Sequence, residues 1–208
     1  MKYRFVFFDV DSTLVTIEGI DVLAGGNPEV VRLTEAAMNG EIPIDQVYGR
    51  RLEIIRPIRA QVEALGELYT RSLVDGAAHT IATLHNEGAH VHLVTAGIAQ
   101  AIAPLAAKLN VRNVHAVSLQ FDDEGNYLDF DRRSMLTRNG GKELVVRSVL
   151  ARSKGKSAFV GDGASDLETK GVVDCFIGFG GVVVRPAVKE GAELYAMSMS
   201  SVLTYLTE

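Results

Sequence analysis

One stretch, Phe5 to Leu14, constrains the fold of this chain more than any other. It opens with the apolar run Phe-Val-Phe-Phe, which predicts a buried strand because it is rich in aromatic and β-branched residues and too short for a core helix. The run ends at two carboxylates, Asp9 and Asp11. In an open α/β sheet, ligands bind beyond the carboxyl ends of the strands. The two acids therefore indicate either a divalent cation site or a solvated turn. The residues at the ends of the other predicted strands distinguish these two possibilities.

The pattern of apolar residues divides the remainder into two parts. Residues 15–73 show helical spacing and no convincing strand, with one helix predicted to start near Pro57 and to end at Gly66. From residue 76 onward, helical segments alternate with strand-like runs at residues 90–94, 114–119, 157–160 and 174–177. Such alternation predicts right-handed βαβ units and an α/β fold with a parallel sheet that is covered on both faces.

The composition argues against several classes of function. The chain of 208 residues has a formal net charge of −5, so we expect no broad basic surface for nucleic acid. Its one cysteine, Cys175, leaves no intrachain disulfide, which fits a reducing compartment. No apolar run approaches the ~18–20 residues of a membrane helix, and Asp9 comes too early for a signal peptide. We therefore expect a cytoplasmic protein that binds neither membrane nor nucleic acid.

Polar residues follow three of the predicted strands. The first strand ends at Asp9 and Asp11, the second ends at Thr95, and the fourth ends at Asp162 with Asp166 four residues later. Because the carboxyl ends of parallel strands meet at one edge of a sheet, we expect these side chains to lie together. Four acids cannot all be ionised at one site without a cation, and Mg²⁺ prefers oxygen ligands. The sequence therefore predicts a magnesium site at this edge.

A lysine adds a second kind of chemistry to the predicted site. Lys142 follows Asn139-Gly-Gly at the start of a predicted helix. Together with Thr95 and nearby backbone N–H groups, it suits phosphate oxygens and the charge that develops during phosphoryl transfer. Each of these residues is ordinary when taken alone. Their arrival in order, each at a strand end or a helix start, favours one shared phosphate site over a set of solvated turns.

Several motifs of this chain resemble those of known enzymes. Four of them resemble the motifs of the haloacid dehalogenase superfamily: Asp9-Val-Asp-Ser-Thr-Leu14, the turn at Thr95, Lys142 and Gly161-Asp-Gly-Ala-Ser-Asp166. Others resemble the phosphoserine phosphatase family: Glu18-Gly-Ile-Asp21, Ala37-Met-Asn-Gly-Glu41, Arg50-Arg51-Leu52, Gly140-Gly-Lys142 and Phe176-Ile-Gly-Phe-Gly-Gly181. The resemblance covers nearly the whole chain. It implies a Rossmann-like core of residues 1–14 and 74–208, with residues 15–73 as an inserted helical cap.

The resemblance also implies a two-step phosphoryl transfer. Asp9 would be the nucleophile, and Asp11 would be the general acid for the leaving alcohol and then the base for the hydrolytic water. Mg²⁺ would be bound by the Asp9 carboxylate, the backbone carbonyl of Asp11 and Asp162. Asp166 would lie close behind, where it orients the metal ligands or Lys142.

The phosphate-binding residues follow from the same resemblance. Ser12, Thr95 and Lys142 would hold the phosphate, with Ala96 and Gly97 beside Thr95 in the binding turn. Many family members have Ser-Gly-Gly-Phe where this chain has Thr-Ala-Gly-Ile at residues 95–98. The threonine keeps the hydroxyl, whereas the alanine adds a methyl group where the backbone approaches the phosphate.

Two residues of the helical segment are implied to bind the rest of the substrate. Glu18 would face an ammonium group and Arg51 a carboxylate, which are the two charges that an amino-acid phosphate presents at its far end. Residues 42–44, Ile-Pro-Ile, lack an aromatic side chain that commonly walls this pocket in the family. This departure leaves the identity of the substrate less sharply defined than the phosphatase chemistry.

The sequence thus predicts a Mg²⁺-dependent phosphomonoesterase that hydrolyses O-phosphoserine, a small-molecule phosphate ester, as a monomer or homodimer. One alternative is hydrolysis of another small ester, such as phosphohomoserine or a phosphosugar, and a second is transfer of the phosphoryl group to an acceptor alcohol. A third is a receiver-like, metal-binding module without turnover. The helical insertion after the first strand and the Asp-x-Asp-Ser-Thr motif count against this third alternative.

Overall fold

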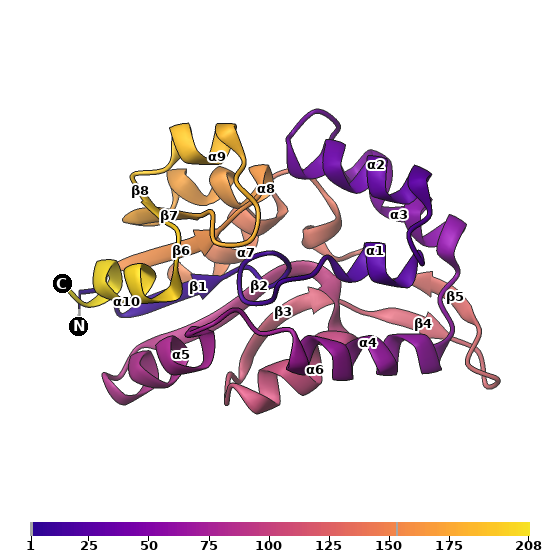
Figure 1. Cartoon of the computed structure of the whole chain (residues 1–208), viewed down its shortest axis with the longest axis horizontal. Coiled ribbons are helices and arrows are strands. Elements are labelled where there is room, and N and C mark those ends of the chain that lie inside the picture. The colour runs from indigo at the N-terminus through magenta and orange to yellow at the C-terminus, as the bar shows by residue number, and fades with distance from the viewer. Residues whose placement is uncertain (1, 153) are drawn as a thin grey trace.

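The computed structural model describes residues 2–152 and 154–208 and is built around one parallel sheet. The strands lie in the order β3-β2-β1-β6-β7-β8, and each neighbouring pair is parallel (Figure 1). They are β1 (Phe5–Phe8), β2 (His90–Ile98), β3 (Asn113–Val117), β6 (Ser157–Gly161), β7 (Cys175–Phe179) and β8 (Leu194–Ala196). The α/β class is confirmed, and β1, which leads into Asp9, lies between β2 and β6.

Helices cover both faces of this sheet. In Figure 1, α5 and α6 lie below it, whereas α8 and α9 lie above it. The helices and 3₁₀ turns of this part are α5 (Ala77–Asn86), α6 (Ala99–Lys108), η1 (Met135–Thr137), α7 (Gly141–Leu150), α8 (Ala164–Leu167), η2 (Glu168–Gly171), α9 (Pro186–Gly191) and α10 (Met199–Thr207). Coverage on both faces explains why β1 is apolar at every position and buried throughout.

A helical segment separates β1 from α5. It contains α1 (Gly19–Leu23), α2 (Pro28–Met38), α3 (Ile44–Ile55) and α4 (Arg59–Arg71). In Figure 1 these helices lie at the right, beside the antiparallel hairpin of β4 (Leu119–Phe121) and β5 (Tyr127–Phe130). An isolated antiparallel bridge between Val15 and Leu73 brings the two ends of the segment together. The assignment of residues 15–73 to a separate cap domain stays a prediction.

The helix α4 is longer than the sequence predicts. We expected Gly66 to end it, but the helix continues through this residue to Arg71. A Cβ atom at Gly66 would lie 3.1 Å from Pro104 Cγ and 3.2 Å from the carbonyl oxygen of Ala101, both in α6. Gly66 therefore allows the close approach of α4 to α6 and does not terminate a helix.

The second strand also differs from its predicted bounds. We expected β2 to end at Val94, but it continues to Ile98, and its pairing with β3 shifts register between these two residues. Thr95 therefore lies within the irregular end of a strand, at the edge of the sheet where β1 leads into Asp9. The short strand β8 was not predicted, because its three residues, Leu-Tyr-Ala, form no recognisable apolar run.

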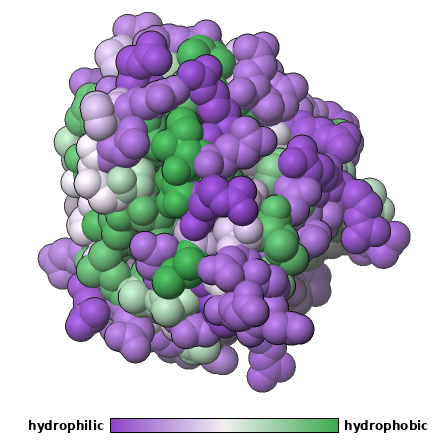
Figure 2. Space-filling model, turned by 90° about the vertical axis from the view of Figure 1, so that its right-hand side faces the viewer, coloured by the Kyte–Doolittle hydropathy of each residue, from purple (hydrophilic) through white to green (hydrophobic). Residues whose placement is uncertain are grey.

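The hydrophobic core lies between the sheet and its helices. Aromatic side chains cross the centre of the sheet, where Phe7 stacks against Phe159 and Phe159 against Phe176, all of them fully buried. On the face formed by the helical segment and the hairpin, a band of hydrophobic residues lies among hydrophilic ones (Figure 2). Within residues 2–152 and 154–208, no helix has the length and apolarity needed to cross a bilayer.

Candidate active site

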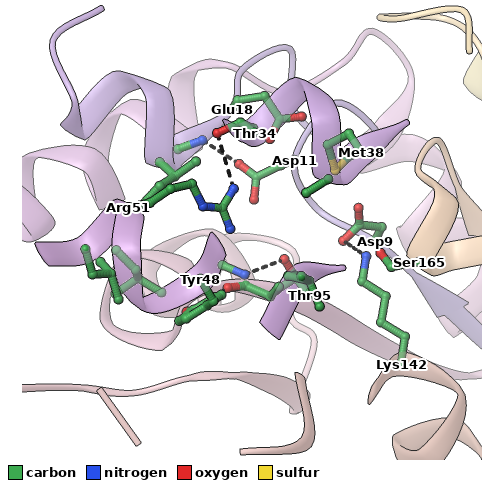
Figure 3. Close-up of a pocket in the computed structure, with 18 of the residues that line it drawn as sticks. Asp9, Asp11, Glu18, Thr34, Met38, Tyr48, Arg51, Thr95, Lys142 and Ser165 are labelled. Atoms are coloured by element: carbon green, nitrogen blue, oxygen red, sulfur yellow. Dashed lines mark hydrogen bonds and ion pairs between the residues drawn. The ribbon is translucent and has the colours of Figure 1, made fainter. Parts of the chain in front are cut away.

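One cavity lies at the carboxyl edge of the sheet, between the strand ends and the helices α1 to α4. The predicted site residues that line it are Asp9, Asp11, Glu18, Arg51, Thr95, Ala96, Gly97 and Lys142. In the close-up, Asp9 and Lys142 lie on one side, while Glu18, Arg51 and Asp11 lie together on the other (Figure 3). The three remaining predicted residues, Ser12, Asp162 and Asp166, are buried next to this lining.

Three carboxylates and a lysine form the deep part of the site. Oxygen atoms of Asp9, Asp162 and Asp166 lie within 4.8 Å of one another, and all three side chains are buried. The ammonium of Lys142, at the start of α7, lies 2.5 Å from Asp166 Oδ1 and 2.9 Å from Asp9 Oδ1. The convergence of these distant residues, which the order of strands and helices predicts, is therefore present.

Two further residues, which the sequence analysis missed, hold Asp162. The Thr13 hydroxyl donates to Asp162 Oδ1 over 2.9 Å, and Arg185 Nε lies 3.3 Å from Asp162 Oδ2. Arg185 also donates to Asn39 Oδ1, at the end of α2. Thr13 belongs to the Asp-x-Asp-Ser-Thr motif, so a signal for it was present in the sequence. Arg185 stands in a loop between β7 and α9 and carries no local signal.

Burial and mutual repulsion govern the protonation of this cluster. Burial, reinforced by Asp9, raises the pKa of Asp166 to about 8 and that of Asp162 to about 6. Burial alone would lower the pKa of Lys142, but Asp166 and Asp9 outweigh it and hold this pKa well above its ordinary value. The lysine therefore stays charged at neutral pH. Ionisation of all three carboxyl groups together is energetically unfavourable.

The cluster fits a divalent cation. Lys142 lies near Asp9 Oδ1 without hydrogen-bond alignment, so this buried oxygen has no hydrogen-bond donor among the described residues. An unpaired carboxylate oxygen beside two other buried carboxylates is a donor set that a hard cation satisfies. The carboxyl group of Asp11 is directed toward Tyr69 and Gly19 and is not part of this cluster. The use of its backbone carbonyl as a metal ligand stays a prediction.

Asp11 is held by two donors from the helical segment. The hydroxyl of Tyr69, near the end of α4, donates to Asp11 Oδ1 over 2.7 Å, and the backbone N–H of Gly19 donates to the same oxygen over 2.7 Å. Burial raises the pKa of Asp11 to about 6, with Tyr69 opposing the rise and Asp9 adding to it. A raised pKa is what a general acid needs near neutral pH. Tyr69 was not predicted as a site residue, because it lies beyond Gly66, where the helix was expected to end.

The irregular end of β2 lines the side of the cavity that is predicted to hold phosphate. Thr95 is buried, and its hydroxyl accepts a hydrogen bond from the Gly97 backbone N–H over 2.9 Å. The Tyr48 hydroxyl, from α3, donates to the carbonyl oxygen of Ala96 over 3.0 Å. Ser12 lies behind this lining, and its hydroxyl donates to Glu18 Oε1 over 2.7 Å. The predicted contact of Ser12 with phosphate stays a prediction.

Glu18, directly before α1, and Arg51, in α3, both line the cavity. Arg51, in α3, is buried, and its Nη1 donates to Thr34 Oγ1 over 3.2 Å. Its Nε has no hydrogen-bond acceptor among the described residues, and burial lowers the pKa of its guanidinium. Burial, with Asp11 and Asp162 adding to it, raises the pKa of Glu18 well above its usual range. A buried guanidinium with an unpaired nitrogen is suited to an anionic ligand.

Comparisons with known proteins agree with this arrangement. The haloacid dehalogenase-like hydrolase family matches residues 6–169. A phosphoserine phosphatase of Bos taurus is 36% identical over 209 aligned residues, which cover 98% of this chain and 93% of the relative. The chain belongs to the phosphoserine phosphatase family of haloacid dehalogenase-like hydrolases.

Other members of the family share both parts of the molecule. A chloroplastic phosphoserine phosphatase of Arabidopsis thaliana is 34% identical and covers 97% of this chain, which spans 71% of that relative. A solved structure described as a phospho-aspartyl intermediate analogue of phosphoserine phosphatase has a TM-score of 0.86 at 26% identity, with 100% of both chains covered. Because the coverage is complete, the family fold includes the helical segment as well as the sheet.

Proposed function

We propose that this chain is a Mg²⁺-dependent phosphomonoesterase that hydrolyses O-phosphoserine to serine and phosphate through an aspartyl phosphate. Its relatives include phosphoserine phosphatases that match nearly its whole length. Solved structures of similar fold are described as the phospho-aspartyl intermediate analogue and the substrate-bound complex of such an enzyme. We further propose that it works in the cytoplasm as a monomer or homodimer.

The observation that carries the substrate assignment is that Arg51 and Glu18 line the same cavity without forming an ion pair with each other. Arg51 is buried, and no described carboxylate forms an ion pair with it. A substrate carboxylate would supply the missing partner, and Glu18 would face the substrate ammonium. The same cavity reaches Asp9 at its other end (Figure 3). A phosphorylated amino acid has its charges distributed in this order.

The chemistry assigns a separate task to each residue at the phosphate end. An Asp9 carboxylate oxygen attacks phosphorus, and the bond to the serine oxygen breaks as Asp11 gives that oxygen its proton. Asp11 then takes a proton from water, whose oxygen attacks phosphorus while Asp9 leaves with the electron pair. Lys142 and Thr95, which both line the cavity, would bind the phosphoryl oxygens and stabilise their charge.

A divalent cation has a defined place in this proposal. Asp9, Asp162 and the backbone carbonyl of Asp11 would bind it, and Asp166, which contacts Lys142, would keep the lysine oriented toward the cluster. When bound, the cation supplies positive charge that polarises the phosphate and lowers its repulsion from Asp9. Mg²⁺ is the proposed ion because the donors are all oxygen atoms.

A second candidate is hydrolysis of, or transfer from, another small phosphate ester. Ile44 and Ile98 both line the cavity, at two of the places where this chain departs from the family pattern. Smaller side chains than the usual aromatic ones leave room for a larger organic group. Phosphohomoserine or a phosphosugar would then be the substrate, with the Asp9 chemistry unchanged.

A panel of phosphate esters assayed with and without Mg²⁺ tests the proposal. We expect phosphoserine to have the highest kcat/KM, with activity lost on chelation and restored by Mg²⁺. Faster turnover of a phosphosugar would reject the serine assignment and keep the mechanism. Labelled phosphate recovered on an added alcohol such as homoserine would identify a phosphotransferase. If no ester of the panel is turned over, the proposal that this chain is a phosphatase is wrong.

A further inference from the structure

The carboxyl group of Asp11 has two unlike sides. Its Oδ1 accepts two hydrogen bonds of 2.7 Å, one from the Tyr69 hydroxyl and one from the Gly19 backbone N–H. Its Oδ2 faces the phosphate side, because a Cβ atom built on Gly97 would lie 3.2 Å from Asp11 Oδ2 and 3.1 Å from Thr95 Oγ1. One oxygen is therefore saturated by donors from α1 and α4, and the other is directed toward the reacting groups.

The contact with Tyr69 is built tightly into the fold. Tyr69 is 1% exposed, and a Cβ atom at Gly19 would lie 1.9 Å from its hydroxyl oxygen. Only glycine at position 19 lets the first turn of α1 approach both the tyrosine and Asp11. Burial, together with Asp11, raises the pKa of Tyr69 well above its usual range, so its hydroxyl keeps the proton that it donates.

We propose that Tyr69 is a positioning residue for Asp11, which holds Oδ1 so that Oδ2 is the oxygen that exchanges protons with the leaving group and with water. This inference rests on the proposed function, in which Asp11 is the general acid and base. Tyr69 itself does not touch the reacting atoms in this scheme. An oxygen that accepts two short hydrogen bonds is a poor site for a proton, so the acidic proton resides on Oδ2.

The proposal has a consequence for each half of the reaction. In the first half, the Oδ2–H proton moves to the serine oxygen as the P–O bond breaks and that oxygen keeps the electron pair. In the second half, Oδ2 takes the proton of the attacking water, and the neutral acid is restored for the next turnover. Without Tyr69, the carboxyl group can rotate and offer the wrong oxygen in both halves. A small misplacement of a catalytic group reduces rates by about 10²-fold.

A comparison of leaving groups separates positioning from mere packing. A nitrophenolate leaves without a proton, whereas the alkoxide of serine needs one. In rapid-quench single-turnover experiments with Mg²⁺, we expect Tyr69→Phe to slow phosphorylation by phosphoserine by about 10- to 100-fold. We expect phosphorylation by p-nitrophenyl phosphate to change by less than about threefold, because it needs no general acid. Dephosphorylation should slow for both esters, so that nitrophenolate appears in a burst when p-nitrophenyl phosphate is in excess over the enzyme.

The control variant is Tyr127→Phe, which removes a hydroxyl from another buried tyrosine, one that does not line the cavity. We expect its rates on both esters to match those of the unmodified chain. Equal losses in the phosphorylation rate with both esters in Tyr69→Phe would show that the residue serves the fold alone, and no loss in the phosphorylation rate with phosphoserine would show that it does not position the acid. Either result overturns the proposal.

A double-mutant cycle keeps the test decisive if Tyr69→Phe lowers stability. In an Asp11→Asn background, we expect Tyr69→Phe to cause no further loss on phosphoserine, because the group that it positions is absent. A further loss of the same size would contradict the proposal. If the unmodified chain hydrolyses other alkyl phosphates but not phosphoserine, the proposed substrate is wrong, and the same comparison with that alkyl ester still decides the role of Tyr69.

Discussion

At the scale of single residues, Asp9 is the side chain on which the proposed chemistry depends. It is buried 2.9 Å from the Lys142 ammonium and keeps an oxygen with no hydrogen-bond donor among the described residues. We expect Asp9→Asn to lower kcat by at least about 10³-fold, because an amide cannot form the aspartyl phosphate. Circular dichroism should show an intact fold. Residual activity above about 5% of the unmodified rate would identify another nucleophile.

The prediction for Arg51 concerns the binding of substrate and not the chemical steps. Its guanidinium lines the cavity with Nε unpaired, so we expect Arg51→Lys to lose the planar, two-point contact with a substrate carboxylate. The KM for phosphoserine should rise by about tenfold or more, which corresponds to about 1.4 kcal/mol, with a smaller change in kcat. Steady-state kinetics on phosphoserine and on an ester without a carboxylate checks this, since the second substrate should show little change.

The neighbouring arginine provides a matched control for this substitution. Arg50 is on the same helix, but its side chain is 58% exposed and pairs with Glu29 at the surface. We expect Arg50→Lys to leave the KM unchanged, because exposed ion pairs contribute only about 0–1 kcal/mol and this one is outside the cavity lining. Equal effects of the two substitutions would mean that Arg51 acts through the fold of α3 and not through the substrate.

At the scale of elements, the contact between α4 and α6 holds the helical segment against the sheet side of the molecule. Gly66 lies at this contact, with Pro104 and Ala101 opposite. We expect Gly66→Val to destabilise the chain by about 1–3 kcal/mol through overpacking, which would lower the Tm by roughly 2–12 °C. Gly171→Ala is the control, because a Cβ atom there meets nothing within 4 Å. Similar thermal midpoints for the two variants would contradict the packing role.

The elements that the sequence predicts are those whose signal is local. The run Phe5–Phe8 and the polar residues after it identify β1 and its place at a sheet edge, and Gly-Gly before Lys142 identifies the start of α7. The parts that were missed depend on contacts between distant segments. Gly66 has the composition of a helix end but serves packing, and the course of α4 past it is what brings Tyr69 to Asp11.

The missed members of the site follow the same rule. Arg185 is 23 residues from Asp162 in sequence, and nothing in its own loop indicates that the two side chains are paired. Thr13 lies beside two predicted residues, yet its partner is 149 residues away. Sequence patterns therefore predict which strand end carries an acid, whereas the side chains that hold this acid are determined by tertiary packing.

At the scale of the whole molecule, binding of a cation should stabilise the folded chain. The acids around Asp9 and Asp162 repel one another in the absence of a counter-ion, and only the folded state brings them together. At a Mg²⁺ concentration of ~100 times Kd, linkage contributes about 2.7 kcal/mol, which predicts a rise in Tm of roughly 5–10 °C. Thermal melts with Mg²⁺ and with a chelator measure this rise.

Two variants decide whether that stabilisation comes from the site. We expect Asp162→Asn to abolish the Mg²⁺-dependent rise, because it removes a buried carboxylate from the cluster. Asp123→Asn removes an exposed acid from the turn between β4 and β5 and should leave the rise unchanged. If both variants respond to Mg²⁺ as the unmodified chain does, the cation binds elsewhere.

The central position of β1 has a consequence for how the molecule is made. During synthesis this strand is made before its neighbour β6, and Lys142, which contacts Asp9, comes more than a hundred residues after that acid. A nascent chain that ends before Arg185 contains Asp162 with Thr13 as its donor, but lacks the guanidinium that contacts the other carboxylate oxygen. The proposed metal-binding cluster is thus completed only once Arg185 has been made, and chains that terminate before this residue are expected to be inactive.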